Sequence, residues 1–224
     1  MRITQLEPQI RRPDRWNLSL DGAFAFGLDG AVVVEEGLAV GQELTPAAVE
    51  RLRAAAAERD LYAAALRFLA PRPRSRAEVR RRLLRPRPKH PSADAGAVER
   101  VLERLTRDGY LDDRDFAGFW VENRERFSPR GARALAAELR QRGVDRATVE
   151  AATDPDRDAE RALAAGRQKL HTLAGLDYQA FRDRLGPFLL RRGFGYDVAR
   201  TAVRQLWDEA RGDHSADDDT PDDE

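Results

Sequence analysis

Apolar and polar residues alternate along the first 40 residues, and this pattern predicts β-strands. The turn dipeptide Asp21-Gly22 separates two of the alternating runs, which is typical of a β-hairpin. We therefore expect a small sheet of two or three strands. The alternating runs are ITQLEPQ (3–9), WNLSL (16–20) and AFAFGL (23–28).

A second Asp-Gly pair leaves one segment ambiguous. Asp29-Gly30 precedes AVVVEEGL, residues 31–38. The dipeptide is again a hairpin signal, but a short apolar run also fits a helix. Both a further strand and a short helix remain open for this segment.

From Thr45 onward, apolar residues recur at helical spacing, and Ala, Leu, Glu and Arg are abundant. This combination favours α-helices. Thr45-Pro46 places an N-cap residue before a proline at the first helical position, and the segment 47–70 that follows predicts one long helix or two. Ser75, with Glu78 three residues later, forms a capping box and predicts another helix start.

The helical spacing also predicts core positions in the next two segments. Apolar residues at i, i+3, i+4 and i+7 indicate an amphipathic helix that stops at Asp108-Gly109. The segment 112–124 begins with acidic residues, which stabilise a helix N-terminus. We interpret the aromatic residues as core rather than as base-stacking groups. The predicted core positions are Val98, Val101, Leu102, Leu105, Phe116, Phe119, Trp120 and Trp207.

Two nearly identical phrases, LRQRGV (139–144) and LLRRGF (189–194), each end a predicted helix at a glycine. A glycine just past a helix C-terminus supplies the left-handed conformation of the cap. We expect Ser128-Pro129 to cap the helix before the first phrase. Pro187 should kink or split the helix before the second phrase.

The equivalent positions of these phrases divide the helical part into three units of three helices. Such small units bury too little surface to be stable alone, so we expect them to stack into an elongated, curved array. The predicted fold class is mostly α, with three tandem three-helix repeats after a small β-hairpin-containing N-terminal extension. The predicted boundaries are 1–44 for the β-rich extension, 45–60 for a linking helix, 61–110, 111–154 and 155–211 for the repeats, and 212–224 for a disordered acidic tail.

The formal net charge is zero because a basic body and an acidic terminus cancel. Residues 212–224 hold seven acidic residues and no Lys or Arg, which leaves 39 basic and 32 acidic residues elsewhere, a net charge of +7. A basic body suits a polyanionic partner. The acidic terminus could compete for the same surface or simply be a solvated tail.

Arginines crowd one predicted helix and the loop after it, and arginines also precede both glycine turns. They could contact DNA phosphates or acidic patches on a protein. The alternatives are a solvated face produced by codon bias for the first group and helix-dipole complementarity for the second. The candidate contact residues are Arg74, Arg76, Arg80, Arg81, Arg82, Arg85, Arg87 and Lys89 in the first group, and Arg140, Arg142, Arg191 and Arg192 in the second.

The sequence offers no positive sign of catalysis, of a cofactor or of a metal site. It has no cysteine and no P-loop motif for ATP. Four acids lie close together, but their spacing fits helix capping better than a calcium loop. No apolar run approaches the roughly 18 residues of a membrane span, and the N-terminus is not a signal peptide. We therefore expect a cytoplasmic, non-enzymatic protein. The four acids are Asp108, Asp112, Asp113 and Asp115.

Several segments together resemble the RecX family of bacterial regulatory proteins. The resemblance covers about residues 1–209, including a β-containing extension that some members carry. The chain departs from the family in the prolines of 86–91, at Gly186-Pro187 and in the acidic tail. The segments that carry the resemblance are SRAEVRRRLL (75–84), VERVLERLTRDGYLDDRDFAGFWVENR (98–124), SPRGARALAAELRQRGV (128–144) and FLLRRGFGYDVARTAV (188–203).

The resemblance implies that the protein binds the RecA filament, lies along its helical groove, and inhibits RecA ATPase and strand exchange. Members limit filament growth or promote filament disassembly, and some also bind DNA. The expected partners are therefore RecA and its filament, with single- and double-stranded DNA as further candidates, no membrane and no cofactor, and the expected state is a monomer. Two alternatives stay open: a helix-turn-helix-like DNA-binding regulator, and a protein scaffold without a nucleic-acid role.

Overall fold

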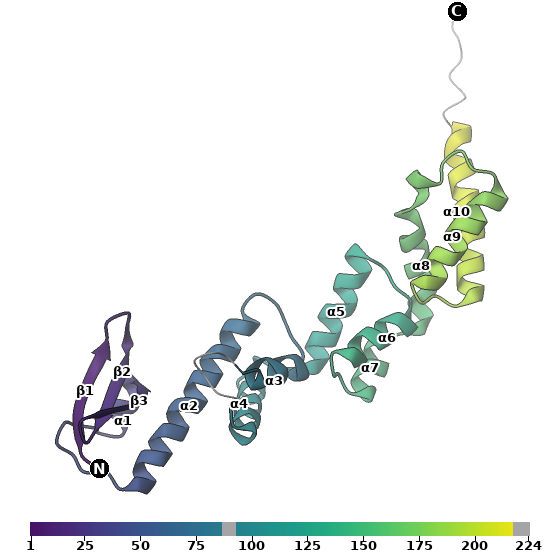
Figure 1. Cartoon of the computed structure of the whole chain (residues 1–224). Coiled ribbons are helices and arrows are strands. Elements are labelled where there is room, and N and C mark those ends of the chain that lie inside the picture. Colours follow the sequence, from purple (N-terminus) through teal and green to yellow (C-terminus); the bar gives the residue numbers. More distant parts are fainter. Residues whose placement is uncertain (87–92, 217–224) are drawn as a thin grey trace, which may run out of the picture. The chain divides into compact units, whose positions relative to one another are not determined.

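The computed structural model describes residues 1–86 and 93–216 (Figure 1). By their internal contacts, the residues fall into two units. The first unit comprises Met1–Arg72 and Glu78–Leu111. The second comprises Pro73–Ala77 and the chain from Asp112 onward. Within the described residues, none of the helices reaches the length and apolar character that a membrane crossing requires.

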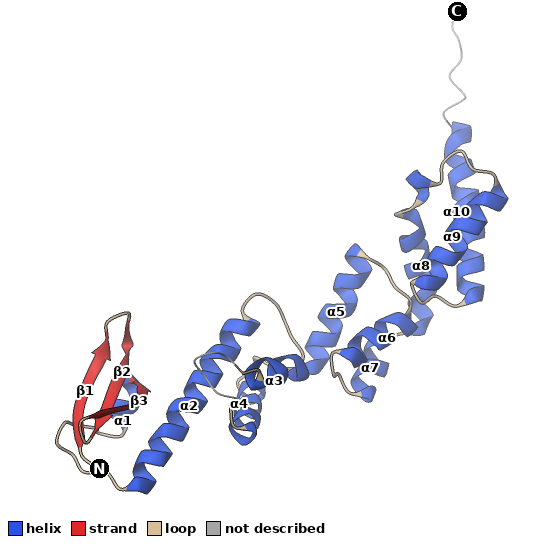
Figure 2. Ribbon diagram, in the orientation of Figure 1, coloured by secondary structure: helices blue, strands red, loops and turns tan. Residues whose placement is uncertain are grey.

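The chain begins with a three-stranded antiparallel sheet of order β1-β2-β3 (Figure 2). Asp21 and Gly22 join the last two strands with positive φ angles of 48° and 85°, as a two-residue hairpin of the primed type requires. The predicted hairpin is therefore confirmed. The strands are β1 (Ile3–Gln9), β2 (Arg12–Leu20) and β3 (Ala23–Asp29).

The second Asp-Gly pair starts a helix, α1 (Gly30–Glu35), so the hairpin interpretation of this pair is wrong. The carboxylate of Asp29 accepts a hydrogen bond from the backbone N–H of Ala31 at 2.9 Å and caps the helix. Val32 and Val33 then bury against the sheet core. The short helix was the alternative that fitted, because Asp serves equally well in a turn and at an N-cap.

One continuous helix, α2 (Pro46–Leu69), connects the sheet to the first repeat. The hydroxyl of Thr45 accepts from the backbone N–H of Ala48 at 3.2 Å, which confirms the predicted cap. Val49 and Leu52 pack in the same cluster as the sheet residues. Further along, Ala65 packs in the core of the first three-helix repeat.

The other two helices of this repeat are α3 (Arg76–Leu84) and α4 (Ala95–Arg107). Val79 and Leu83 of α3 are buried in one cluster with the apolar stripe of α4. All four α4 positions predicted from the helical spacing are at most 3% exposed. The amphipathic helix is therefore confirmed, and Gly109 follows it with a φ of 77°.

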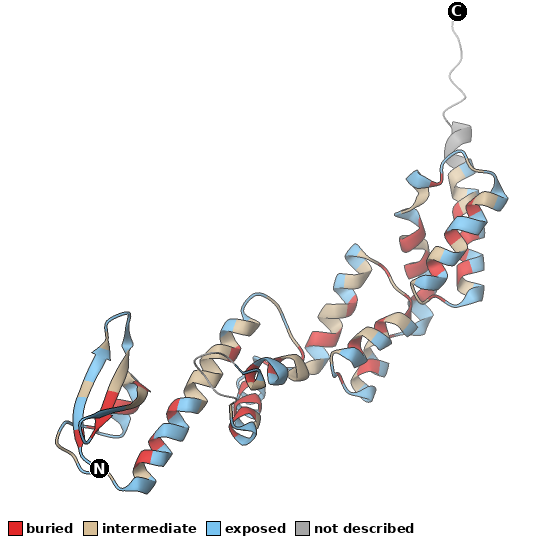
Figure 3. Ribbon diagram, in the orientation of Figure 1, coloured by how far each residue is buried: buried red, intermediate tan, exposed pale blue. Residues whose placement is uncertain are grey.

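The second unit contains the second repeat, whose three helices share a core that includes Phe116, Leu135, Leu139 and Val149. Figure 3 colours the buried positions along the chain red. The helices of this repeat are α5 (Asp113–Phe127), α6 (Ala132–Gln141) and α7 (Arg146–Ala152). Ser128 ends α5, and Gly131 is the N-cap of α6. The prediction that Ser128-Pro129 caps α6 is therefore wrong, because the N-cap is Gly131, three residues after Ser128.

The third repeat packs Phe181, Leu185, Leu189 and Leu206 in a separate core. Pro187 lies inside α9, which continues through it, so the expected split does not occur. Helix α10 extends to Ala216 and so includes the first residues assigned to the acidic tail; residues 217–224 lie outside the described part. The elements are η1 (Pro155–Arg157), α8 (Asp158–Arg167), η2 (Leu170–Thr172), α9 (Tyr178–Arg191) and α10 (Tyr196–Ala216).

Candidate partner-binding surface

The two Arg-Gly phrases form the same helix-ending turn. Gly143 and Gly193 have φ angles of 80° and 89°. After α6, the N–H of Val144 donates to the carbonyl of Leu139 at 3.2 Å, and after α9 the equivalent bond from Phe194 is 3.4 Å. The N–H of Gly143 also donates to the carbonyl of Arg140, and the N–H of Gly193 donates to the carbonyl of Leu190. Together, the two bonds at each turn define a Schellman cap. The predicted role of both glycines is confirmed.

Each of these turns contacts the start of the second helix in the preceding repeat. The carbonyl of Arg142 accepts from the hydroxyl of Ser75, just before α3, at 2.6 Å. The carbonyl of Arg192 accepts from the N–H of Gly131, just before α6, at 3.0 Å. The repeated phrase is therefore an inter-repeat contact, used wherever a repeat follows another.

Both glycines also lack a side chain for steric reasons. A Cβ added at Gly143 would lie 2.3 Å from the Cβ of Ala77, and one at Gly193 would lie 2.5 Å from the Cβ of Ala134. Real Cβ atoms do not approach so closely, since carbon atoms in contact are about 3.5–4.0 Å apart. Both positions therefore require glycine for two reasons: the positive φ angle, and the close approach of the neighbouring alanine.

A carboxylate completes each junction by capping the same helix from the next repeat. The first residue of α5, Asp113, accepts from the N–H of Arg76 at 2.7 Å. The first residue of α8, Asp158, accepts from the N–H of Ala132 at 2.8 Å. Arg76 and Ala132 are the first residues of α3 and α6, whose leading N–H groups have no partner inside their helix.

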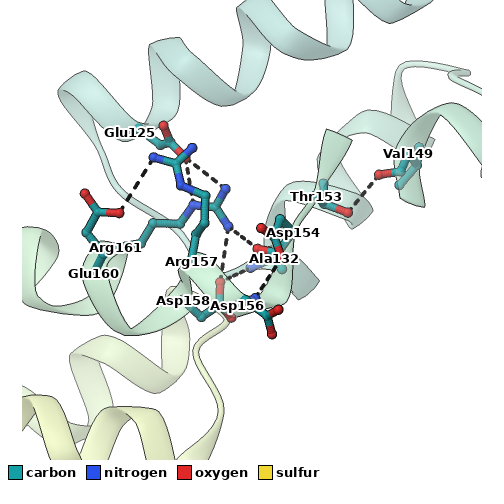
Figure 4. Close-up of polar contacts among 10 residues, drawn as sticks. All are labelled: Glu125, Ala132, Val149, Thr153, Asp154, Asp156, Arg157, Asp158, Glu160 and Arg161. Carbon is teal, nitrogen blue, oxygen red and sulfur yellow. Dashed lines mark hydrogen bonds and ion pairs between the residues drawn. The ribbon is translucent and has the colours of Figure 1, made fainter. Parts of the chain in front are cut away.

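The second junction also contains a buried ionic network (Figure 4). Arg161 is only 3% exposed, and its guanidinium donates to Glu125 at 2.8 Å, to the carbonyl of Asp154 at 2.7 Å and to Asp158 at 3.4 Å. Arg157 lies 3.0 Å from the same Glu125. A buried charge needs such a full set of partners. Sequence reasoning missed this network, since Arg161 looks like any other arginine of a charged helix.

The arginines of α3 and of the residues beside it differ in their contacts and in their exposure to solvent. Arg80 forms an ion pair with Glu99 at 2.5 Å, and the Arg82 guanidinium lies 5.6 Å from the ring centre of Phe68. Arg81 and Arg85 are exposed and make no ion pair within the part of the chain that the structure describes. Arg74 and Arg76 are half-buried beside the junction, and Arg87 and Lys89 lie outside the described residues.

The four arginines of the glycine turns divide into two exposed and two packed side chains. Arg142 lies 3.6 Å from the ring centre of Trp120 and donates to the carbonyl of Glu138 at 3.2 Å. Arg192 is similarly packed against an aromatic ring, 4.6 Å from the centre of Phe188. Arg140 and Arg191 are exposed. The packed pair fixes the turns, which leaves the exposed pair as the better contact candidates.

The acidic residues around the end of the first repeat serve structural roles. Asp112 accepts from the backbone N–H groups of Arg114 and Asp115 and caps α5. Asp108 accepts from the hydroxyl of Tyr62 at 2.5 Å, and this hydrogen bond raises the pKa of that tyrosine. Within the described residues, no group of three or more acidic or histidine side chains could hold a metal ion. The predicted capping of α5 is confirmed for Asp112, whereas Asp113 caps α3 instead.

Models of four RecX domains match this chain in consecutive order. "Regulatory protein RecX N-terminal domain" matches residues 1–45, and the first, second and third RecX three-helix domains match 62–85, 112–152 and 156–203. The match to the first repeat ends at residue 85, directly after α3, and therefore does not include α4.

Curated relatives and solved structures agree with this assignment. "Regulatory protein RecX" of Mycobacterium sp. (strain KMS) is 38% identical over 154 residues, which are 65% of this chain and 81% of the relative. The RecX protein of Thermobifida fusca (strain YX) is 38% identical over 157 residues, or 67% of this chain and 82% of the relative. A crystal structure of regulatory protein RecX shares the fold, with a TM-score of 0.66 and 22% identity over 90% of this chain and 98% of that one. The chain therefore belongs to the RecX family of regulatory proteins.

Proposed function

We propose that this protein is a non-enzymatic, cytoplasmic regulator that binds the RecA nucleoprotein filament along its groove. In this role it inhibits RecA ATPase activity, filament extension and strand exchange, and thereby modulates recombination and DNA repair. Family membership carries the proposal, because all four RecX domains occur in this chain in order. The ATPase belongs to RecA, so the regulator needs no catalytic group of its own.

The exposed arginines support binding to an anionic surface. Arg81 lies in the last turn of α3, and Arg85 is the residue directly after the helix; both side chains are exposed. Guanidinium groups bind carboxylate and phosphate through two parallel hydrogen bonds. Acidic patches of RecA and the DNA inside its filament both offer such acceptors. We infer that this helix, with Arg140 and Arg191, contacts the filament and that the protein acts as a monomer.

Inhibition requires unequal affinity for the states of RecA. A ligand shifts an equilibrium only by as much as its affinities for the two states differ. We therefore expect the protein to bind the active filament and free RecA with different dissociation constants. Equal constants would remove the physical basis of the proposal.

The deciding experiment measures ATP hydrolysis by RecA from the same organism on single-stranded DNA while this protein is titrated in. Strong inhibition at well below one copy per RecA supports a regulator that acts at filament ends or across many subunits. Inhibition that appears only near saturation indicates plain competition for DNA. No inhibition, with DNA binding intact, would favour the helix-turn-helix-like DNA-binding regulator instead.

A further inference from the structure

Helix α5 and the loop between α5 and α6 each bring one arginine to the same carboxylate of α6. Glu138 accepts from the Nε of Arg124 at 2.8 Å and lies 3.0 Å from a guanidinium nitrogen of Arg130. It also accepts from the indole N–H of Trp120 at 2.7 Å. A single carboxylate, 14% exposed, therefore already serves two guanidinium groups and an indole.

Arg192 adds a further positive charge to this group. Its guanidinium donates to the hydroxyl oxygen of Ser128 at 3.2 Å and to the carbonyl of Pro129 at 3.0 Å. Both acceptors are neutral, and no carboxylate pairs with Arg192 within residues 1–86 and 93–211, the ones with described side chains. Burial and the nearby charge of Arg130 both lower the pKa of Arg192. The two arginines thus repel each other, and an anion between them would relieve that repulsion.

The same place offers hydrogen-bond donors that are not used. The buried Nε of Arg130 has no acceptor in the part of the chain that the structure describes. The Ser128 hydroxyl accepts from Arg192, which leaves its own proton available to a further acceptor. A buried donor without an acceptor costs free energy, so a bound anion that fills this position would be stabilised.

We propose that Ser128, Arg130 and Arg192 form a binding site for a phosphate group at the junction of the second and third repeats. Ser128 and Arg130 come from the α5–α6 loop, and Arg192 comes from the turn after α9. A phosphate bound there would bridge the two repeats through the hydroxyl and both guanidinium groups. This site is inferred from the local donors and charges, and it does not depend on the proposed action on RecA.

The donor set favours phosphate over a carboxylate. Two guanidinium groups and a hydroxyl offer more donors than the two oxygens of a carboxylate can accept in one plane, whereas a phosphate presents its oxygens tetrahedrally. Glu138 already supplies the carboxylate that reaches Arg130. The phosphate could belong to a free phosphate ion or to a nucleic-acid backbone, since both present the same oxygens.

The test is thermal unfolding of the full chain in inorganic phosphate and in sodium chloride of equal ionic strength and pH. At ten times its dissociation constant, phosphate should raise the Tm by about 3 °C beyond the chloride value. The increment should vanish in Arg192→Gln and Arg130→Gln. It should persist in the control Arg184→Gln, which removes an equal charge from an exposed position on α9.

Each variant is compared with itself in the two salts, so a lower basal Tm does not obscure the result. If Arg192→Gln does not fold, Arg192→Lys serves instead, because it keeps the charge and loses the two-nitrogen fork. A short single-stranded oligonucleotide that gives the same Arg192-dependent increment identifies a phosphodiester as the source, and its failure beside a phosphate effect identifies free phosphate. No phosphate-specific increment, an equal loss in Arg184→Gln, or an increment from polyglutamate alone would overturn the site.

Discussion

The carboxylate of Asp158 accepts a hydrogen bond from the backbone N–H of Ala132 at 2.8 Å. Asp158 is the first residue of α8 in the third repeat, and Ala132 is the first residue of α6, the second helix of the second repeat. A residue of one repeat therefore caps a helix of another. The bond from Arg76 to Asp113 repeats this arrangement at 2.7 Å. Because the cap is present only when the next repeat is in place, helix formation in one repeat is coupled to folding of its neighbour.

Replacing Asp158 by Ala should therefore destabilise the second unit strongly. The change removes the cap of α6 and one of the two carboxylates around the buried Arg161. Losing a cap costs about 1 kcal/mol, and leaving a buried charge short of a partner costs more. We expect a loss of about 2–3 kcal/mol in the free energy of unfolding, measured by urea denaturation.

The matched control for this change is Asp183→Ala. Asp183 pairs with Arg182 on the surface of α9, and both side chains are more than half exposed. Exposed pairs contribute little, so this variant should stay within about 0.5 kcal/mol of the original chain. Equal effects of the two substitutions would show that Asp158 is not a link between repeats.

Gly193→Ala should separate the packed contact of the turn from its backbone angle. Gly193 has a φ of 89°, and an added Cβ would lie 2.5 Å from the Cβ of Ala134. Gly175 has a similar φ of 75° with nothing within 4 Å of its Cβ position. Gly175→Ala should cost about 1 kcal/mol for the angle alone, and Gly193→Ala should cost at least twice as much in the same urea assay.

A second substitution tests whether the extra cost arises at Ala134. Combining Gly193→Ala with Ala134→Gly removes the closest of the clashing carbons, although the backbone nitrogen of Ala134 would still lie 2.9 Å away. The pair should therefore recover part of the lost stability, as contacting residues show a coupling energy in a double-mutant cycle. Simple additivity of the two single effects would contradict the contact.

Local signals in the sequence were enough to predict most of the elements. Asp21-Gly22, Thr45-Pro46 and the glycines of the two phrases act on residues beside them, so their effects follow from short-range chemistry. The role of Asp29 was ambiguous because the same side chain suits a turn and a helix cap. The expected split at Pro187 did not occur, because buried residues on both sides of the proline, Leu185 and Leu189, hold the helix together.

The junctions could not be predicted, because their partners lie far apart in sequence. Gly131 is the N-cap of α6, and a Cβ at this position would lie only 2.4 Å from the carbonyl oxygen of Gly193. Only glycine therefore fits there. Nothing near Gly131 in the sequence indicates that contact. Likewise, Arg142 and Arg192 resemble Arg140 and Arg191 in sequence, and only the aromatic rings against them distinguish packed from exposed side chains.

The pH dependence of stability should reveal the burial of Asp113. Desolvation raises the pKa of this carboxyl above its ordinary value of 3.8, assisted by the charges of Asp145 and Asp112, while the Arg76 N–H and its guanidinium oppose the shift. The folded state thus binds the proton more tightly than the unfolded state, so this group disfavours folding once pH rises through the window from 3.8 to the raised value.

Asp113→Asn removes this titration and keeps an oxygen that can accept from Arg76. Relative to the original chain, the variant should gain stability as pH rises from 3 to 7, measured as the difference between their urea midpoints at each pH. Other carboxyl groups cancel in that difference. A difference that moves in the opposite direction would mean that the hydrogen bond from Arg76 outweighs burial.

Reversing the charges of Arg81 and Arg85 should weaken the proposed inhibition of RecA. Both side chains, at the end of α3 and directly after it, are exposed without an ion pair in the described residues, so Arg81→Glu/Arg85→Glu should leave the Tm nearly unchanged. On an anionic filament the change of four charge units should raise the concentration needed for half-inhibition of ATP hydrolysis about tenfold or more, and more steeply at low salt.

The control Arg184→Glu/Arg204→Glu makes the same change in net charge on α9 and α10, at exposed positions outside the candidate contact set. Similar losses in both variants would mean that overall charge, and not the α3 face, controls binding.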